Sequence, residues 1–227
     1  MNSGKAFAIS DFFQLLATCL RYPDEDLINA LLEGAVAHDA TLILFEMGVD
    51  EKICEQVASS FSKAVARIDV SEPLRSVKLD YTRLFTHPKQ PLLTYYETTF
   101  RHKMKMGFPD VTEGIPSLFV SPAATDATAH YLRLGLKKED TKSNEPSDYV
   151  VTELEFLAHA YLFLGMALEK DNASEAEKVW KEIESFCALH VFNWMPTFFL
   201  KLEELGDTYY GFLNSFWLAG SPMVGSR

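Results

Sequence analysis

The sequence is poor in cysteine and has no long uninterrupted apolar run. It has only three cysteines, without Cys-x-x-Cys spacing, so neither a disulfide framework nor a cysteine-rich zinc site is indicated. No run of about 18 uncharged apolar residues occurs, and the first residues lack the basic and apolar regions of a secretory signal. These absences predict a protein of the reducing cytoplasm that is neither exported nor inserted into a membrane.

Catalytic and cofactor-binding motifs are also missing. No phosphate-binding glycine loop, dinucleotide fingerprint or HExxH motif is present. Glu153 and Glu155 stand at i and i+2, so they cannot share one face of a helix. Histidines are scattered along the chain, among them His87, His102, His130, His159 and His190. The sequence therefore predicts no cofactor and no metal, and it favours a binding protein over an enzyme.

Basic residues are few compared with acidic ones. The chain has 32 Asp and Glu against 21 Lys and Arg, which gives a formal net charge of −11 at pH 7. Nucleic acid and anionic lipid also carry dense negative charge and would be repelled. We therefore expect no nucleic-acid partner and no stable membrane insertion. A basic segment of another protein is the natural electrostatic complement.

Apolar residues recur at helical spacing, and alternating strand-like runs are hard to find. With 227 residues, 48% of them hydrophobic, the chain can bury a large core. The prediction is an all-α fold, a bundle of about ten helices. The expected helices begin at Ser10 or Asp11, at Asp24, at Asp50, at Pro73, at Tyr96, near Asp126 and after Asp148, and two apolar stripes follow, Ala176 to His190 and Phe198 to Phe216. The helix after Asp148 should bury a single stripe, Leu154, Leu157, Tyr161, Leu164 and Leu168.

Prolines and glycines interrupt the helical pattern between residues 86 and 122, where a structured connection is expected. Residues 137–147 are the most linker-like stretch. We expect one domain over residues 7–220, with an N-terminal part (7–136), a hinge (137–147) and a C-terminal part (148–220). Such a hinge would permit a homodimer by exchange of the C-terminal helices.

Four segments carry the most specific patterns. They are, in order, Arg21-Tyr22-Pro23-Asp24-Glu25 after the first helix; Asp80-Tyr81-Thr82-Arg83-Leu84-Phe85 with the later Tyr96-Glu97-Thr98-Thr99-Phe100; the run EPSDYVVTELEFL from Glu145 to Leu157; and Phe186-x3-His190-x3-Trp194-x-Pro196-x-Phe198. Together they resemble the TorD/DmsD family of redox-enzyme maturation chaperones, which includes nitrate reductase assembly proteins. Two departures stand out: Thr94-Tyr95 replaces the family's paired prolines, and Tyr149 replaces its usual histidine.

The resemblance implies a cytoplasmic chaperone dedicated to one molybdopterin oxidoreductase. Its partners would be the apo catalytic subunit of that enzyme and its twin-arginine signal peptide, a basic segment followed by an apolar stretch. Two alternatives remain open at this point. The chain could be a permanently attached assembly subunit of such a reductase, or an all-helical acid/base hydrolase.

Acidic side chains beside a hydrophobic groove are what such a peptide requires. Glu145 and Asp148, with their turn held by Pro146, either cap a helix N-terminus or receive an arginine guanidinium. His190 and Trp194 either face the peptide or lie in the core. We expect Asp148→Ala to change specificity more than folding. Tyr81, Leu84, Phe85, Tyr95, Tyr96 and Phe100 are candidates to line the groove, and the predicted peptide-binding set is Glu145, Pro146, Asp148, Tyr149, Tyr81, Phe85, Tyr96, Glu97, His190 and Trp194.

Overall fold

A computed structural model describes residues 1–89, 91–107, 121–137, 145–205 and 209–225, and within these ranges the chain is helical with no β-strand. The α-helices of the described residues are α1 (Ser3–Leu20), α2 (Glu25–Leu32), α3 (Ala35–Met47), α4 (Glu51–Val65), α5 (Pro73–Tyr81), α6 (Glu97–Lys105), α7 (Pro122–Arg133), α8 (Val150–Glu169), α9 (Ala173–Phe186), α10 (Met195–Glu204) and α11 (Phe212–Gly220). Two π-helical turns, η1 (Thr82–Thr86) and η2 (Cys187–Val191), continue α5 and α9, and two 3-10 turns, η3 (Tyr209–Gly211) and η4 (Ser221–Met223), flank α11. The all-α prediction is confirmed.

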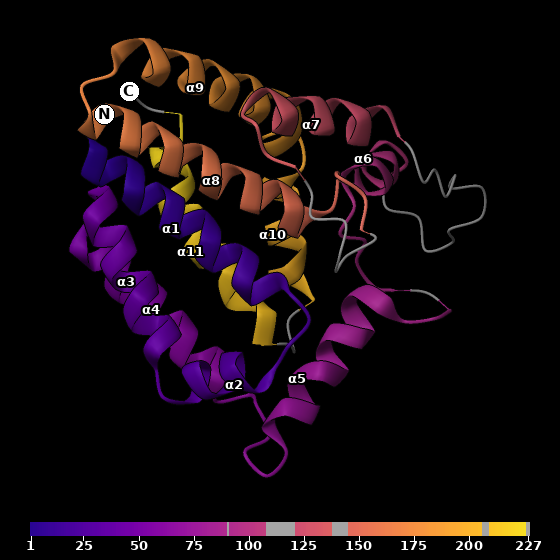
Figure 1. The fold of residues 1–227 in the computed structure, drawn as a ribbon. Coiled ribbons are helices and arrows are strands. Elements are labelled where there is room, and N and C mark those ends of the chain that lie inside the picture. The colour runs from indigo at the N-terminus through magenta and orange to yellow at the C-terminus, as the bar shows by residue number, and fades with distance from the viewer. Residues whose placement is uncertain (90, 108–120, 138–144, 206–208, 226–227) are drawn as a thin grey trace.

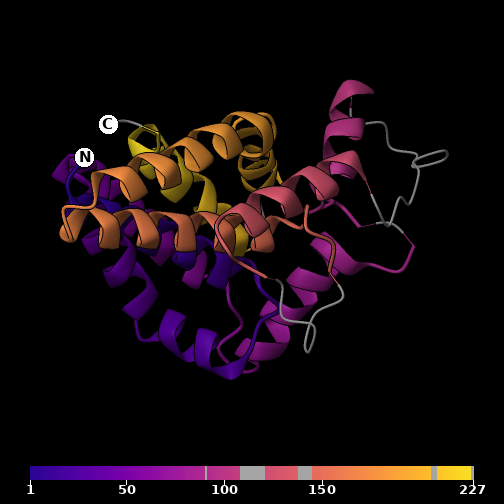
Figure 2. The ribbon, with the colours of Figure 1, turned by 45° about the horizontal axis from the view of Figure 1, so that its top comes forward.

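The centre of the fold is the antiparallel pair α1 and α8 (Figure 1). Ser10 Oγ donates to the carbonyl oxygen of Ala158 at 2.7 Å, and Arg21 pairs with Glu155 near the other end of the contact. Helices α3, α4 and α11 pack on one side of this pair and α9 on the other. Figure 2 shows α6 and α7 together at one end of the molecule, with both chain termini at the opposite end.

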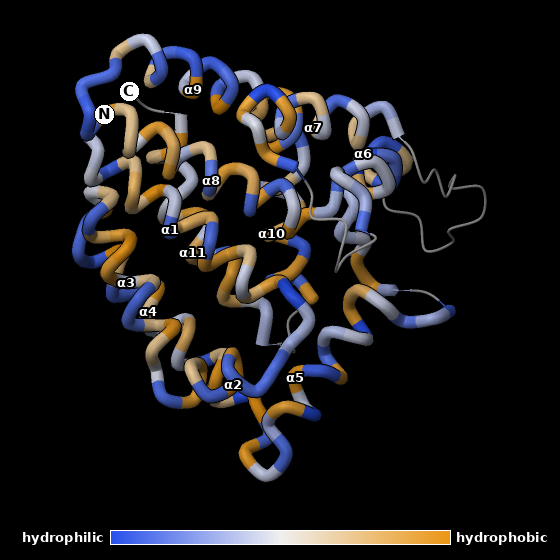
Figure 3. The backbone as a smooth tube through the Cα atoms, viewed as in Figure 1, coloured by the Kyte–Doolittle hydropathy of each residue, from blue (hydrophilic) through white to orange (hydrophobic). Residues whose placement is uncertain are grey.

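Helix α8 buries a wider face than the predicted apolar stripe. Four of the five stripe residues are buried and Leu168 is half-buried, and the helix also buries Val151, Glu153, Phe156, Ala158 and Ala160. The residues that remain exposed are His159, Leu162, Met166 and Glu169. By length and composition α8 could cross a membrane, but 67% of its apolar window is enclosed by the rest of the protein. The hydropathy colours agree, because α1, α8 and α11 are mostly hydrophobic while α9 has long hydrophilic stretches (Figure 3).

Several predicted helix boundaries are confirmed by their caps. The carboxylate of Asp24 accepts the backbone N–H of Leu27 at 2.9 Å, and Asp50 caps α4 in the same way. Pro73 is the first residue of α5. Gly135, which follows α7, has a φ of +74°, the left-handed conformation that glycine adopts most readily after a helix.

Other boundaries differ from the prediction. Helix α1 begins at Ser3, capped by Asn2, because the residues before Ser10 also pack against α8. Helix α7 begins at Pro122 with Ser121 as its cap, rather than near Asp126. The last predicted stripe is divided between α10 and α11, and α3 was not predicted at all. Residues 138–144, most of the predicted hinge, lie outside the described residues, so the domain division stays a prediction.

Candidate functional site

Two motif segments that are distant in sequence meet at one backbone crossing. Tyr96 and Tyr149 form an isolated antiparallel β-bridge. The N–H of Glu97 donates to the carbonyl oxygen of Asp148 at 2.9 Å, and the N–H of Val150 donates to that of Tyr95 at 2.9 Å. The bridge therefore ties the start of α6 to the start of α8, and it brings together the second and third of the segments with specific patterns.

Asp148 is enclosed beside this bridge, with 4% of its surface exposed. Its Oδ2 accepts hydrogen bonds from the Thr98 hydroxyl at 2.6 Å, the Thr98 N–H at 3.3 Å and the Ser121 hydroxyl at 3.2 Å. It thus caps α6, whereas α8, the helix that follows it in sequence, has no side-chain cap. The interpretation of Asp148 as a cap of its own following helix is wrong, because the bridge carries its carboxylate to the neighbouring helix instead.

Glu145 lies closer to the surface, in the turn that precedes the bridge. Its Oε2 accepts a hydrogen bond from the Tyr96 hydroxyl at 2.5 Å, and Glu145, Pro146 and Tyr149 are all half-buried. Burial, together with the hydrogen bond to Glu145, raises the pKa of Tyr96, so the phenol remains a donor. The hydroxyl of Tyr131 on α7 holds the same turn by donating to a main-chain carbonyl oxygen in it at 2.7 Å.

A row of aromatic rings runs from the surface to this turn. Neighbouring ring centroids lie 4.8 to 5.2 Å apart, in tilted or edge-to-face arrangements that aromatic pairs prefer. The members of this aromatic row are Tyr22, Tyr81, Phe85, Tyr95, Tyr96 and Tyr149. Among the predicted groove residues only Tyr96 is half-buried, and the others are buried: Tyr81, Leu84, Phe85, Tyr95 and Phe100. The accessible rings of the row are therefore Tyr96 and Tyr149 at the turn and, at the other end, Tyr22, which is 56% exposed and was not predicted to line the groove.

Six members of the predicted peptide-binding set lie inside the molecule, namely Tyr81, Phe85, Glu97, Asp148, His190 and Trp194. Three of them contact one another. Glu97, His190 and Trp194 are 0%, 2% and 0% exposed. His190 Nδ1 lies 2.8 Å from Glu97 Oε2, and the Trp194 indole N–H donates to the carbonyl oxygen of His190 at 2.6 Å. Arg101 Nη1 lies 2.6 Å from the other oxygen of Glu97. In this conformation these residues support the core, and contact with a peptide would require α6 and η2 to separate.

A second buried carboxyl group, Glu153 on α8, faces the same pair. It is fully buried, and within the described part of the chain its two oxygens make no hydrogen bond. Ligand atoms of Glu97, Glu153 and His190 all lie within 4.8 Å of one another. Burial first, and then the negative charge of Glu97, raises the pKa of Glu153 well above its ordinary value, which favours the protonated acid.

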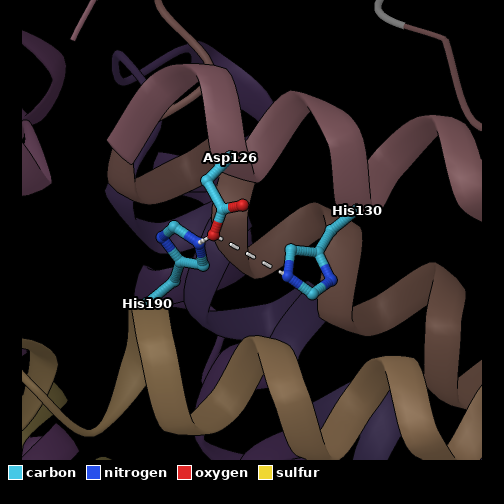
Figure 4. Close-up of side chains that lie close together, drawn as sticks. All are labelled: Asp126, His130 and His190. Carbon is cyan, nitrogen blue, oxygen red and sulfur yellow. Dashed lines mark hydrogen bonds and ion pairs between the residues drawn. The ribbon is translucent and has the colours of Figure 1, made fainter. Parts of the chain in front are cut away.

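The polar interior continues from His190 to α7. His190 Nε2 lies 3.0 Å from Asp126 Oδ2, and His130 Nε2 lies 4.0 Å from the same oxygen (Figure 4). His130 Nδ1 in turn lies 2.8 Å from Glu182 on α9. Sequence reasoning treated these histidines as scattered. Only the i, i+4 spacing of Asp126 and His130 hinted at a shared site, because the partner from η2 comes from the fold.

An open hollow of about 310 Å³ lies between α1 and α3. Its lining combines acidic, polar and apolar side chains. It is lined by Asp11, Gln14, Leu15, Thr18, Asp39, Leu42, Ile43 and Glu46. Burial, and then the charge of Glu46, raises the pKa of Asp11. Sequence patterns do not indicate this hollow, because one of its walls is α3, a helix that they did not predict.

The sequence model of the nitrate reductase delta subunit family matches residues 50–200, about two thirds of the chain. The matched range contains the bridge, the turn at Glu145 and the buried histidines, and it excludes the hollow between α1 and α3. No curated protein and no solved structure matches the chain.

Proposed function

The chain belongs to the nitrate reductase delta subunit family, and we propose that it is an assembly chaperone for a molybdenum oxidoreductase. It would bind the catalytic subunit in the cytoplasm while that subunit still lacks its cofactor, and it would hold the subunit's twin-arginine leader until assembly is complete. Family membership supports the assembly role. The net charge of −11 suits a client that presents a basic segment.

We place leader binding at the turn of Glu145, Pro146 and Tyr149 and the adjacent ring of Tyr96. The single observation that carries this assignment is the Tyr96–Tyr149 bridge, which sets a half-buried carboxylate beside half-buried aromatic rings. A guanidinium can bind the carboxylate while stacking on an aromatic face. The apolar part of the leader would then lie along the accessible rings of the aromatic row.

The energetics of this site suit a partner that must be released. Micromolar affinity corresponds to about 8 kcal/mol, and an exposed arginine–carboxylate pair contributes about 1 kcal/mol or less. Apolar burial, at about 25 cal/mol per Å² before ordering costs, must supply most of the rest. The carboxylate would therefore select the register of the peptide, and the rings would supply most of the affinity.

The interior carboxylates do not favour the hydrolase alternative. Glu97, Glu153 and His190 offer a carboxylate, an acid and an imidazole in one place, but they are 0%, 0% and 2% exposed. A substrate could reach them only if the helices that enclose them separated. We therefore propose a binding role without turnover.

The test is a calorimetric titration of the full chain with the leader peptide of a molybdenum oxidoreductase from the same organism. Wild-type protein and Glu145→Gln are each titrated with the natural leader and with a leader whose two arginines are lysines. We expect micromolar binding, and up to about fivefold weaker binding for each single change, since each removes the same bidentate contact. Glu145→Gln titrated with the lysine leader should then bind no more weakly than either single change does.

Glu46→Gln is the matched control, because Glu46 is an acidic residue of the hollow between α1 and α3. It should leave the affinity unchanged. If Glu46→Gln weakens binding and Glu145→Gln does not, the leader occupies the hollow and the assignment to the turn is wrong. If neither peptide binds at all, leader recognition itself is refuted.

A permanently attached subunit remains the second candidate function, because the matched family is named as a subunit of nitrate reductase. The two roles differ in how long the complex with the enzyme lasts. A permanent subunit would stay with the enzyme after the cofactor is inserted, whereas a chaperone would leave.

A further inference from the structure

The two buried histidines converge on one carboxylate. Asp126 and His130 lie one turn apart on α7, and His190 comes from η2 on the facing element; Figure 4 shows the Asp126 side chain between the two imidazole rings. Both histidines are nearly fully enclosed, while Asp126 is half-exposed at 51%. We propose that Asp126, His130 and His190 form a binding site for a divalent transition metal ion such as Zn²⁺.

The ligand atoms are spaced as a tetrahedral ion requires. Bonds of about 2.0 to 2.1 Å at the tetrahedral angle separate neighbouring ligand atoms by about 3.3 Å. In this structure Asp126 Oδ2 lies 3.0 Å from His190 Nε2 and 4.0 Å from His130 Nε2, and the three ligand atoms all lie within 4.8 Å of one another. An ion would therefore be placed among them by side-chain shifts that shorten the longer separations by about 0.7 to 1.5 Å.

Each imidazole is also held by a second carboxylate, on the ring nitrogen that would not bind the ion. His130 Nδ1 lies 2.8 Å from Glu182, and His190 Nδ1 lies 2.8 Å from Glu97. Such pairing keeps a proton on Nδ1, so that when a metal displaces the proton between His190 Nε2 and Asp126 the Nε2 lone pairs are directed at the ion, as in carboxylate–histidine–zinc arrangements. Two histidines prepared in this way around one aspartate are the independent observation that points to a cation.

The fourth coordination position would face solvent, because the exposed side of Asp126 borders the site. Three protein ligands with an open position could bind water or a donor atom from another molecule. The occupant that competes with the metal is a proton. His190 lies within hydrogen-bond distance of both Glu97 and Asp126, so in the absence of metal an imidazolium can bridge the two carboxylates.

The test uses the full chain, freed of metal by a chelator and titrated with Zn²⁺ by calorimetry and by thermal unfolding. We expect one saturable site, and at Zn²⁺ concentrations about 100 times Kd an upward Tm shift of about 5 to 10 °C. Asp126→Asn should weaken binding at least tenfold, and it should fold normally because Asp126 is half-exposed. Glu182→Gln, which removes the carboxylate behind His130, should weaken binding about 10- to 100-fold.

His159→Gln is the matched control, because His159 is an exposed histidine of α8 outside the cluster. It should bind Zn²⁺ as the wild type does. The proposal is overturned if the wild type shows no saturable binding, or if Asp126→Asn binds Zn²⁺ as tightly as the wild type. The first result would leave the cluster as a proton-bridged ion triad, and the second would place the ion elsewhere.

Discussion

Asp148→Ala tests whether the two acidic residues of the turn have different roles. The substitution removes an enclosed carboxylate that accepts three hydrogen bonds, two from Thr98 and one from Ser121. Ser121 itself caps α7, since its hydroxyl oxygen accepts the N–H of Ala124 at 2.9 Å. One side chain thus supports the first turns of two helices, and its loss leaves buried donors without an acceptor.

The size of the effect follows from these contacts. Loss of a helix cap costs about 0.5 to 2 kcal/mol, and a hydrogen bond to a charged group is worth about 1.5 to 3 kcal/mol. The contributions share one carboxylate and do not simply add. The expectation from the sequence, that Asp148→Ala changes specificity more than folding, is therefore reversed because the carboxylate is enclosed. We expect the substitution to lower the free energy of unfolding by about 2 to 4 kcal/mol, which for a chain of this size is a fall in Tm of about 4 to 16 °C.

The assay is urea unfolding followed by circular dichroism. Asp148→Asn, which keeps an oxygen acceptor but loses the charge, should fall between Asp148→Ala and the wild type. Glu145→Gln should lose less than about 1 kcal/mol, because its carboxylate is only half-buried. If Asp148→Ala unfolds at the wild-type urea concentration yet abolishes leader binding, the assignment of Asp148 to the fold and of Glu145 to the leader is refuted.

Two further predictions concern the core. The pKa of Glu153 is raised above the ordinary 4.5, so the free energy of unfolding of the wild type should fall as pH rises from about 4.5 through the raised pKa, whereas that of Glu153→Gln should not. Urea unfolding near pH 5 and near pH 8 should therefore show the variant gaining stability relative to the wild type at the higher pH. A difference that stays constant with pH would contradict this prediction. A Cβ at Gly220 would lie 2.3 Å from the fully buried ring of Phe12, so Gly220→Ala should lower the free energy of unfolding by about 1 to 3 kcal/mol. Gly165→Ala should lower it less, because the ring that its Cβ would meet, Phe7, is half-buried and can rotate. Thermal unfolding that ranks the two variants in the opposite order would contradict this reasoning.

The helices that the sequence predicted best are those with local signals. Asp24, Asp50 and Pro73 mark helix starts by capping or by fixed φ, and Gly135 marks an end, and all four act as expected. Such signals depend only on neighbouring residues, so they can be identified without the fold.

Features that depend on tertiary packing were missed. Helix α3 mixes buried Leu44 with exposed Leu42 and Phe45, so its apolar pattern does not mark one face. The start of α1 was placed too late because Ser10 and Asp11 also resemble helix caps, whereas the actual cap is Asn2, whose side chain accepts the N–H of Lys5 at 2.8 Å.

For the candidate site, the sequence identified the segments but not how their side chains pair. It named both Asp148 and Tyr96, yet only the bridge shows that Asp148 caps α6 while Tyr96 bonds to Glu145. It also named His190 without its partners. The contact with Asp126 joins residues of different helices, and no spacing rule in one dimension predicts such a pair.

The most direct test of the central claim is native mass spectrometry of the chain mixed with the catalytic subunit of its molybdenum oxidoreductase, first without and then with the molybdenum cofactor. The chaperone account predicts a one-to-one complex with the cofactor-free subunit that disappears once the cofactor is inserted. A complex that persists equally with the loaded enzyme would identify a permanent subunit instead, and the absence of any complex with the cofactor-free subunit would contradict the assembly role.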